Sequence, residues 1–286
     1  MAIGADRVYY SGSGGIGAVT YGGTAQSGVS VSDGAVPQGM TEGINGAIYY
    51  AEAGKHLNEF EPSGTSQGTI TSWNDFEVTS YGTNSVVSDP NGNLWFAEDN
   101  NSAVIEMSPW GSLLARTALS SGGQPWHLAI GADAASIWVT ERTANKIAKL
   151  NLSGSLLAEY NLPATNCGSS PNDITLGGDG NMYFTEDVGT GVQGYIGQVT
   201  SSGTISCVVN PNTGNSTGIA EGPDGNIWIA EHEADAIVKF NLSTQTFGTP
   251  FSTASEGGNP EVMALGADGQ LWFITSNDKM TSFKPN

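Results

Sequence analysis

Charged side chains are scarce in this sequence, and positive ones are scarcest. Lysine and arginine together number nine, against 28 aspartate and glutamate residues, and the formal net charge is −19 at pH 7. A surface this acidic repels a phosphate backbone, so we expect no nucleic-acid partner. The negative electrostatic field of such a surface would attract a cation or a cationic ligand. The high negative charge is also explained by a need for solubility alone.

Histidine, cysteine and long apolar runs are also few. No apolar run reaches the roughly 18 residues of a membrane span, so we expect none. Three histidines leave little room for a histidine-rich metal centre. The two cysteines, Cys167 and Cys207, either form a disulfide or remain buried thiols, and the sequence leaves both open. The phosphate-binding loop and the His-Glu-x-x-His motif are absent.

Glycine is abundant, and much of it lies in a segment that recurs along the chain. The clearest copy is residues 177–186 (GGDGNMYFTE), a tight turn followed by an apolar strand that ends in a carboxylate. Glycine and asparagine supply the positive φ that such a turn needs, and the acidic residues do not follow a calcium-loop pattern. The other copies are DPNGNLWFAE (89–98), GPDGNIWIAE (222–231), GADGQLWFIT (266–275), GADAASIWVTE (131–141), GINGAIYYAE (43–52) and GADRVYYS (4–11).

The first aromatic residue of each copy sets the period of the repeat. The steps between these residues are 40, 46, 43, 45, 45 and 44. The seven residues are Tyr9, Tyr49, Trp95, Trp138, Tyr183, Trp228 and Trp272. Short β-rich runs repeated at this distance are typical of a β-propeller with one copy per blade. The sequence therefore predicts a single all-β domain over residues 1–286, a seven-bladed propeller with four-stranded antiparallel blades.

The fourth copy shows the expected blade most clearly, with strands predicted at residues 125–130, 136–140, 146–150 and 156–160. In the first copy, Met1 begins the first strand and residues 16–20 are predicted to be the third. In the last copy, residues 280–283 are predicted to be the third strand, so that blade is expected to lack its fourth. The ring would close either through a strand upstream of this chain or through side-chain packing.

Five copies end in glutamate, and these carboxylates have two interpretations. The residues are Glu52, Glu98, Glu141, Glu186 and Glu231. They could form a site for Mg²⁺ or Ca²⁺ at one mouth of the channel, because these cations prefer oxygen ligands. Alternatively, each could accept backbone N–H bonds from the next blade. Their recurrence favours the structural role, since function usually singles out particular copies of a repeat.

Several segments resemble the virginiamycin B lyase (streptogramin lyase) family. They are residues 222–228 (GPDGNIW), 95–98 (WFAE), 143–150 (TANKIAKL) and 156–163 (LLAEYNLP), and the resemblance extends over nearly the whole chain. It implies a seven-bladed propeller. For an active member, it implies magnesium-assisted elimination that opens a cyclic depsipeptide. In this family, a histidine base follows the proline that opens the first strand of a blade, and a glutamate at the end of the second strand contributes.

The matching positions of this chain carry no histidine. They are Gln38, Asn84, Trp126, Asn172, Thr217 and Glu261. We expect these side chains to line a funnel that binds a small-molecule, peptide or glycan ligand. His127 lies one residue beyond its matching position, and a one-residue shift turns a strand side chain to the other face. The family's general base is therefore expected to be absent.

The alternative is a divalent-metal-dependent lyase or lactonase-like enzyme that opens a cyclic ester. His127 or His232 would be its base, and Glu231 and Glu261 would bind Mg²⁺ or Ca²⁺. His232 follows Glu231 directly, so the two could pair as a base and its orienting carboxylate. A scaffold without a ligand is a third interpretation, because propellers host many unrelated functions.

Two further expectations concern the surface and the setting of the protein. Trp110, predicted in a loop after a third strand, either packs against its neighbours or is exposed to stack on a sugar or an aromatic ligand. We expect a monomer that is secreted or located at the cell surface, with no signal peptide in the present sequence.

Overall fold

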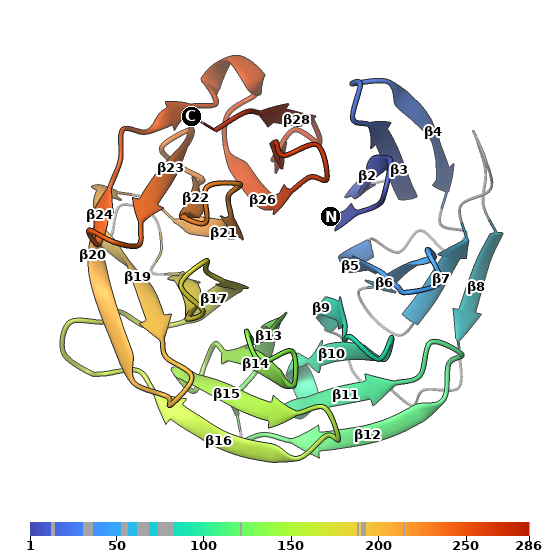
Figure 1. Cartoon of the computed structure of the whole chain (residues 1–286), viewed down its shortest axis with the longest axis horizontal. Helices are drawn as coiled ribbons and strands as arrows, with labels where there is room; N and C mark the ends of the chain where they lie inside the picture. Colours follow the sequence, from blue (N-terminus) through green and yellow to red (C-terminus); the bar gives the residue numbers. More distant parts are fainter. Residues whose placement is uncertain are drawn as a thin grey trace.

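The computed structural model describes residues 1–12, 15–30, 37–52, 57–61, 69–73, 83–120, 122–187, 189, 193–213 and 215–285. Over these residues the chain forms seven antiparallel sheets arranged in a ring around a central channel (Figure 1). Each sheet is a blade, and its first strand faces the channel. This arrangement confirms the predicted all-β, seven-bladed propeller.

The strands follow one another along the chain in every blade. Blade 1 is β1 (Ala2–Ile3), β2 (Arg7–Gly12), β3 (Gly15–Thr20) and β4 (Ala25–Ser30). Blade 2 is β5 (Pro37–Glu42), β6 (Ile48–Glu52), β7 (Leu57–Glu61) and β8 (Thr69–Trp73). Blade 3 is β9 (Thr83–Ser88), β10 (Leu94–Glu98), β11 (Ala103–Met107) and β12 (Leu113–Ala118), with the 3₁₀ turn η1 (Asp99–Asn101) after β10. Blade 4 is β13 (Pro125–Ile130), β14 (Ser136–Glu141), β15 (Lys146–Asn151) and β16 (Leu156–Asn161).

The last three blades differ more in their outer strands. Blade 5 is β17 (Pro171–Leu176), β18 (Met182–Glu186), β19 (Gln193–Val199) and β20 (Ile205–Thr213). Blade 6 is β21 (Ser216–Glu221), β22 (Ile227–Glu231) and β23 (Ala236–Asn241), with two short outer strands, β24 (Thr246–Phe247) and β25 (Phe251–Ser252), followed by the 3₁₀ turn η2 (Ala254–Glu256). Blade 7 is β26 (Pro260–Leu265), β27 (Leu271–Thr275) and β28 (Met280–Phe283), so the predicted three-stranded blade is confirmed.

The repeated turn and the aromatic residue that follows it form one structural unit. In blade 3, Asp89 Oδ1 accepts hydrogen bonds from the backbone N–H groups of Asn91 and Asn93, which closes the turn. Asp89 Oδ2 accepts the indole N–H of Trp95 at 3.0 Å, and Trp95 is fully buried. Blades 6 and 7 repeat this arrangement, with Asp224 beside Trp228 and Asp268 beside Trp272. The recurring aspartate is thus a structural residue, as the turn pattern indicated.

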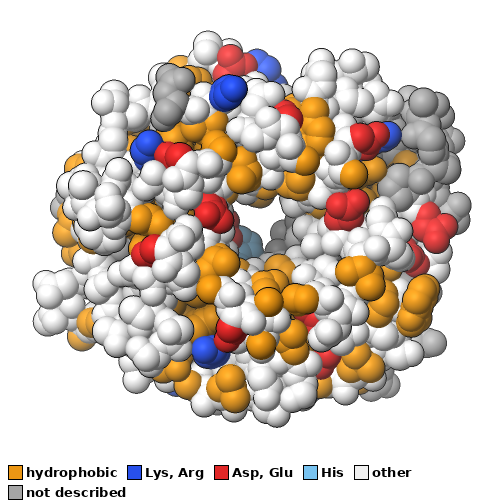
Figure 2. Space-filling view, viewed as in Figure 1, with side chains coloured by type: hydrophobic (Ala, Val, Ile, Leu, Met, Phe, Trp, Pro, Cys, Tyr) orange, Lys and Arg blue, Asp and Glu red, His pale blue; other side chains and the backbone are white. Residues whose placement is uncertain are grey.

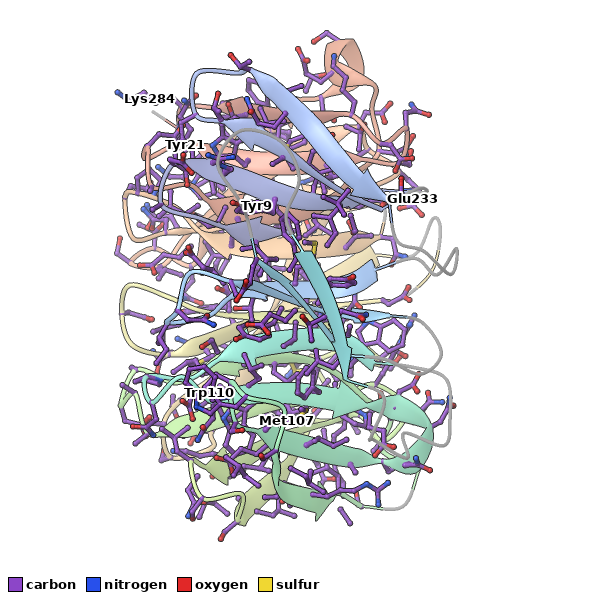
Figure 3. All side chains as sticks on the ribbon, turned by 90° about the vertical axis from the view of Figure 1, so that its right-hand side faces the viewer. Tyr9, Tyr21, Met107, Trp110, Glu233 and Lys284 are labelled. Atoms are coloured by element: carbon purple, nitrogen blue, oxygen red, sulfur yellow. A yellow bond between two sulfur atoms is a disulfide. The ribbon has the colours of Figure 1, made fainter. Side chains whose placement is uncertain are left out.

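Side-chain packing joins blade 7 to blade 1. The hydroxyl of Tyr21, which is labelled in Figure 3, donates to the Gly4 carbonyl at 2.7 Å and accepts the N–H of Ala267 at 3.1 Å. The Tyr21 ring also meets the Trp272 ring edge-on, with 6.0 Å between the centroids. In the described part of the chain, no strand of blade 1 pairs with β28.

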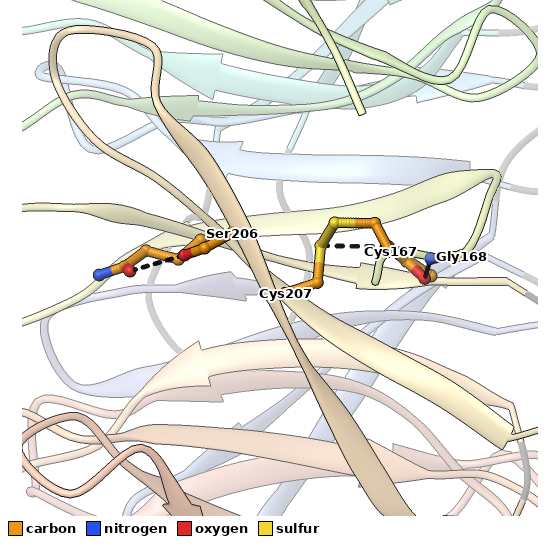
Figure 4. Close-up of a disulfide and its surroundings, with 6 residues drawn as sticks. Cys167, Gly168, Ser206 and Cys207 are labelled. Atoms are coloured by element: carbon orange, nitrogen blue, oxygen red, sulfur yellow. Dashed lines mark hydrogen bonds between the residues drawn. A yellow bond between two sulfur atoms is a disulfide. The ribbon is translucent and has the colours of Figure 1, made fainter. Parts of the chain in front are cut away.

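A disulfide settles the alternatives left open for the cysteines. Cys167, in the connector between β16 and β17, is bonded to Cys207 on β20 (Figure 4). The bond therefore ties the connector that enters blade 5 to the outer strand of that blade. Among the described residues, no helix is long and apolar enough to cross a membrane.

Candidate functional site at one mouth of the channel

A β-bulge near the start of the first strand shapes one mouth of the channel. In blade 4, Pro125 pairs with Glu141 and Leu128 pairs with Val139, so two residues lie opposite Thr140 alone. Those two residues are Trp126 and His127, and both are half-buried. A bulge of this kind breaks strict side-chain alternation. The alternation argument that placed His127 on the opposite face from Trp126 therefore does not apply here.

The same register shift occurs in blades 2 to 7. It brings Trp126, Asn172, Thr217 and Glu261 to corresponding places in four consecutive blades, and all four are half-buried. We call the surface formed by these four residues the channel mouth. Gln38 and Asn84 occupy matching positions on β5 and β9, but their side chains lie outside the described part of the molecule.

Hydrogen bonds between neighbouring blades hold the channel mouth in place. Asn172 Nδ2 donates to the Thr217 carbonyl at 3.1 Å, and Thr217 Oγ1 donates to the Pro260 carbonyl at 2.9 Å. The Thr140 hydroxyl donates to the Asn172 carbonyl at 2.7 Å. Each bond links one blade to the next, so the mouth is a rigid part of the ring.

Two charged pairs flank the channel mouth, and each involves a residue that directly follows a repeated glutamate. Arg142 forms an ion pair with Asp187 of the next blade, and its guanidinium lies 4.7 Å from the centroid of the Trp126 ring. On the other side, His232 Nε2 lies 3.6 Å from Glu261 Oε1. Sequence reasoning missed Arg142 and Asp187. The available signal was that the repeat varies directly after its glutamate.

A third pair, His127 and Asp173, joins the bulges of blades 4 and 5. His127 Nδ1 lies 2.9 Å from Asp173 Oδ1, although the two groups are not aligned for a hydrogen bond. Asp173 also accepts the N–H groups of Ile174 and Ile219, which fix its carboxylate. The space-filling view shows an open channel with a histidine side chain in its depth (Figure 2). A fixed carboxylate beside an imidazole can orient the ring, and it forms an ion pair with the ring when the ring is protonated.

The glutamates at the ends of the second strands are buried, with 0–1% of their surface exposed in Glu98, Glu141, Glu186 and Glu231. Three of them bind the connector that enters their own blade or the outer strand that leads into it. Glu141 accepts the Ser120 hydroxyl, Glu186 the Gly168 N–H, and Glu231 the Asn210 amide. Glu98 is instead bound by Arg116 and Asn101. The structural interpretation is thus supported for these residues, but the predicted partner was wrong, because the bonds do not come from the next blade. The Glu52 side chain lies outside the described part.

Burial raises the pKa of three of these carboxyl groups, because the low-dielectric surroundings disfavour the charged form. The pKa is raised to about 7 in Glu141 and Glu231 and to about 8 in Glu186. The predicted pairing of Glu231 with His232 does not form, since the histidine contacts Glu261 while Glu231 binds Asn210 and Ser216. A cation bound jointly by Glu231 and Glu261 stays a prediction.

Metal-ligating side chains gather at one place in the described residues. Cys167, Glu186 and Cys207 have ligand atoms within 4.8 Å of one another. The two sulfur atoms are bonded to each other, so in this state they are not thiolate ligands.

Comparison with known proteins identifies the family of this chain and solved structures with a similar fold. The family model described as the virginiamycin B lyase family matches residues 63–208. A virginiamycin B lyase of Nocardia farcinica (strain IFM 10152) is 26% identical over 189 residues, which cover 66% of this chain. The match covers 61% of that relative's length.

Solved structures are similar over more of the chain. Selenomethionine-substituted virginiamycin B lyase from Staphylococcus aureus has a TM-score of 0.85 and 21% identity, covering 100% of this chain and 94% of that one. A catalytically inactive His-to-Ala variant from the same organism, with quinupristin, has a TM-score of 0.81 and 22% identity, covering 95% and 88%. At these identities, the structural likeness supports the fold alone.

Proposed function

The chain belongs to the virginiamycin B lyase family, and on that premise we propose that the channel mouth binds a cyclic peptide of the streptogramin type. One observation carries the proposal. Trp126, Asn172, Thr217 and Glu261 occupy corresponding places in four consecutive blades, yet they differ from one another, whereas the turn aspartates and the aromatic residues that they bind repeat. In a repeat protein, function is expected where copies differ on one face.

The chemistry of the channel mouth suits an amide-rich ligand with an apolar part. Trp126 offers an aromatic ring to a ligand. The Arg142 guanidinium packs against this ring and is itself held by an ion pair with Asp187. Asn172 has an amide oxygen available beside the donor that it uses on Thr217. Glu261 has 45% of its side-chain surface exposed and can accept hydrogen bonds from ligand N–H groups.

We propose binding without ring opening. The residues after the strand-opening prolines are Gln38, Trp126, Asn172 and Glu261, and none of them is the histidine that the family uses as a base. His127 and His232 are the described imidazoles near the site, and each faces a carboxylate, Asp173 or Glu261. These two histidines are therefore the residues to replace when turnover is tested.

Calorimetric titration with quinupristin tests the binding. We expect saturable binding by the unaltered protein and at least about fivefold weaker binding by Trp126→Ala, because an aromatic contact is worth about 1 kcal/mol beyond its buried area. Trp110→Ala is the matched control. Trp110 is 79% exposed and lies toward one face of the ring (Figure 3). Glu233 lies toward the other face, and it follows His232, which contacts Glu261 of the channel mouth. Equal affinity in the Trp126→Ala variant, or no binding at all, would refute the proposal.

Chromatography of quinupristin after incubation with the protein tests turnover, with and without added Mg²⁺. We expect the ring to stay intact in both samples. Ring opening that disappears in His127→Ala or His232→Ala would contradict binding without turnover and would make that histidine a catalytic candidate. Ring opening that requires Mg²⁺ and is lost in Glu231→Gln would support the predicted metal site.

A further inference from the structure

A cleft lies between blades 3 and 4, outside the channel mouth. Its volume is about 700 Å³, and it is lined by η1 and the residue after it, by Leu119, Gly122 and Gln124 between β12 and β13, and by Thr143 in the turn after β14. Its polar lining residues are Asp99, Asn100, Asn101, Ser102, Gln124 and Thr143. The volume falls within the range of about 300–1,000 Å³ that is typical of small-molecule sites.

Hydrogen bonds between the lining segments fix the walls of the cleft. Leu119 N–H donates to the Ser102 carbonyl at 2.8 Å, and Arg142 N–H donates to the Gln124 carbonyl at 3.0 Å. The Thr143 hydroxyl donates to the Gly122 carbonyl. The walls therefore come from three segments that are already tied together, and a ligand would enter a site that is largely formed.

The lining chemistry excludes several ligand classes. Among the described lining residues, Leu119 has the one large apolar side chain, and it is buried, so an apolar ligand would leave amide and hydroxyl groups without partners. The described lining contains no lysine or arginine. The nearby Arg116 and Arg142 are held by Glu98 and Asp187, so an anion would find no free cation. Asp99 is the one carboxylate of the described lining, which is too few for a tight Mg²⁺ or Ca²⁺ site.

From these observations we propose that this cleft binds a neutral saccharide of one or two rings. Asn100, Asn101 and Gln124 carry amides that both donate and accept hydrogen bonds, and the Ser102 hydroxyl does the same. The Thr143 hydroxyl donates its proton to Gly122, so its oxygen is offered to a ligand as an acceptor. Such a set complements the hydroxyl groups of a sugar, each of which is also a donor and an acceptor. The proposal rests on the cleft and not on the channel mouth, so the two sites can be tested separately.

Saturation-transfer-difference NMR of the full chain tests the proposal, with maltose, cellobiose and diacetylchitobiose as probes. We expect at least one of the three to receive saturation and to give a dissociation constant by titration. Asn100→Ala should raise that constant about fivefold, as loss of one hydrogen bond predicts. Thr143→Val, which keeps the side-chain shape without the hydroxyl, should also raise it. Asn91→Ala is the matched control, because Asn91 is an exposed asparagine in the first turn of blade 3, at the opposite end of the strands.

Three outcomes would overturn the proposal. In the first, none of the probes binds. In the second, a probe binds equally well to the two cleft variants and to the control. In the third, binding is lost in Trp126→Ala and kept in the cleft variants. The last outcome would place the saccharide at the channel mouth. A calcium titration without saccharide should leave the NMR spectrum unchanged. A saturable change that Asp99→Asn abolishes would make the cleft a cation site instead.

Discussion

Replacing Glu186 with glutamine should make the stability of this protein less dependent on pH. The Glu186 carboxyl group is fully buried, accepts the Gly168 N–H at 2.9 Å and lies 3.8 Å from the disulfide sulfur of Cys207. Burial raises its pKa from 4.5 to about 8. Because the folded-state pKa lies above the unfolded-state value, ionisation favours unfolding. The folded state is therefore expected to lose stability as the pH rises from about 4.5 to about 8.

The size of the effect follows from the two pKa values. One pKa unit corresponds to about 1.4 kcal/mol. The contribution of Glu186 to the free energy of unfolding should therefore fall by roughly 3 kcal/mol between about pH 5 and about pH 8. Glutamine is neutral at both values and has nearly the same shape as the protonated acid. The variant should be about as stable as the parent near pH 5 and more stable near pH 8.

Urea unfolding at several pH values, followed by tryptophan fluorescence with the disulfide intact, measures the difference. Glu98→Gln is the matched control. Glu98 occupies the same place in blade 3, but its carboxylate binds Arg116 at 2.8 Å. Removing that charge should lower stability at both ends of the pH range, since the arginine loses its ion-pair partner. If parent and Glu186→Gln lose stability in parallel as the pH rises, the assignment of the pH dependence to Glu186 is wrong.

Three further predictions concern the fold. Reducing the disulfide, which spans 40 residues, should lower the free energy of unfolding by about 4 kcal/mol, as urea melts with and without a phosphine reductant would show. Asp89→Ala should cost about 1–3 kcal/mol by the same assay, because the buried indole N–H of Trp95 loses its acceptor; an unchanged midpoint would contradict the role of the turn aspartate. Gly218→Ala would place a Cβ 2.4 Å from the Glu261 carbonyl oxygen, so we expect a lower melting temperature and weaker quinupristin binding.

The fold could be predicted from the sequence because its signals are local. The strands of blade 4 were expected at residues 125–130, 136–140, 146–150 and 156–160, and the structure has them within one residue. Alternating apolar residues and glycine turns determine such strands, and each repeat carries both. The same reading of strands and turns predicted that blade 7 lacks a fourth strand, because the sequence ends shortly after the third.

The candidate site was only partly predictable. Aligning the repeats identified Trp126, Asn172 and Thr217, because a position in one blade predicts the corresponding position in the next. Contacts between blades, such as those of Arg142 with Asp187 and of His127 with Asp173, join side chains one repeat apart and depend on how neighbouring blades are turned.

The disulfide and the bulge also could not be predicted from the sequence. Two cysteines alone do not reveal the distance between their side chains, and a bulge changes the direction of a side chain without leaving a motif.

The bulge has a consequence for how such a ring can change its ligand. In each of the six bulged blades, two neighbouring positions lie opposite a single partner residue, and the next position, such as Leu128 or Ile174, returns to the core. Substitutions at the bulge therefore leave the core packing almost untouched, and only positions in contact across blades, such as His127 and Asp173, need to change together. A library that randomises only Trp126, His127, Asn172 and Asp173 should stay mostly folded while sampling many binding surfaces. The same separation would let the residues of the channel mouth change while the packing between the blades is kept.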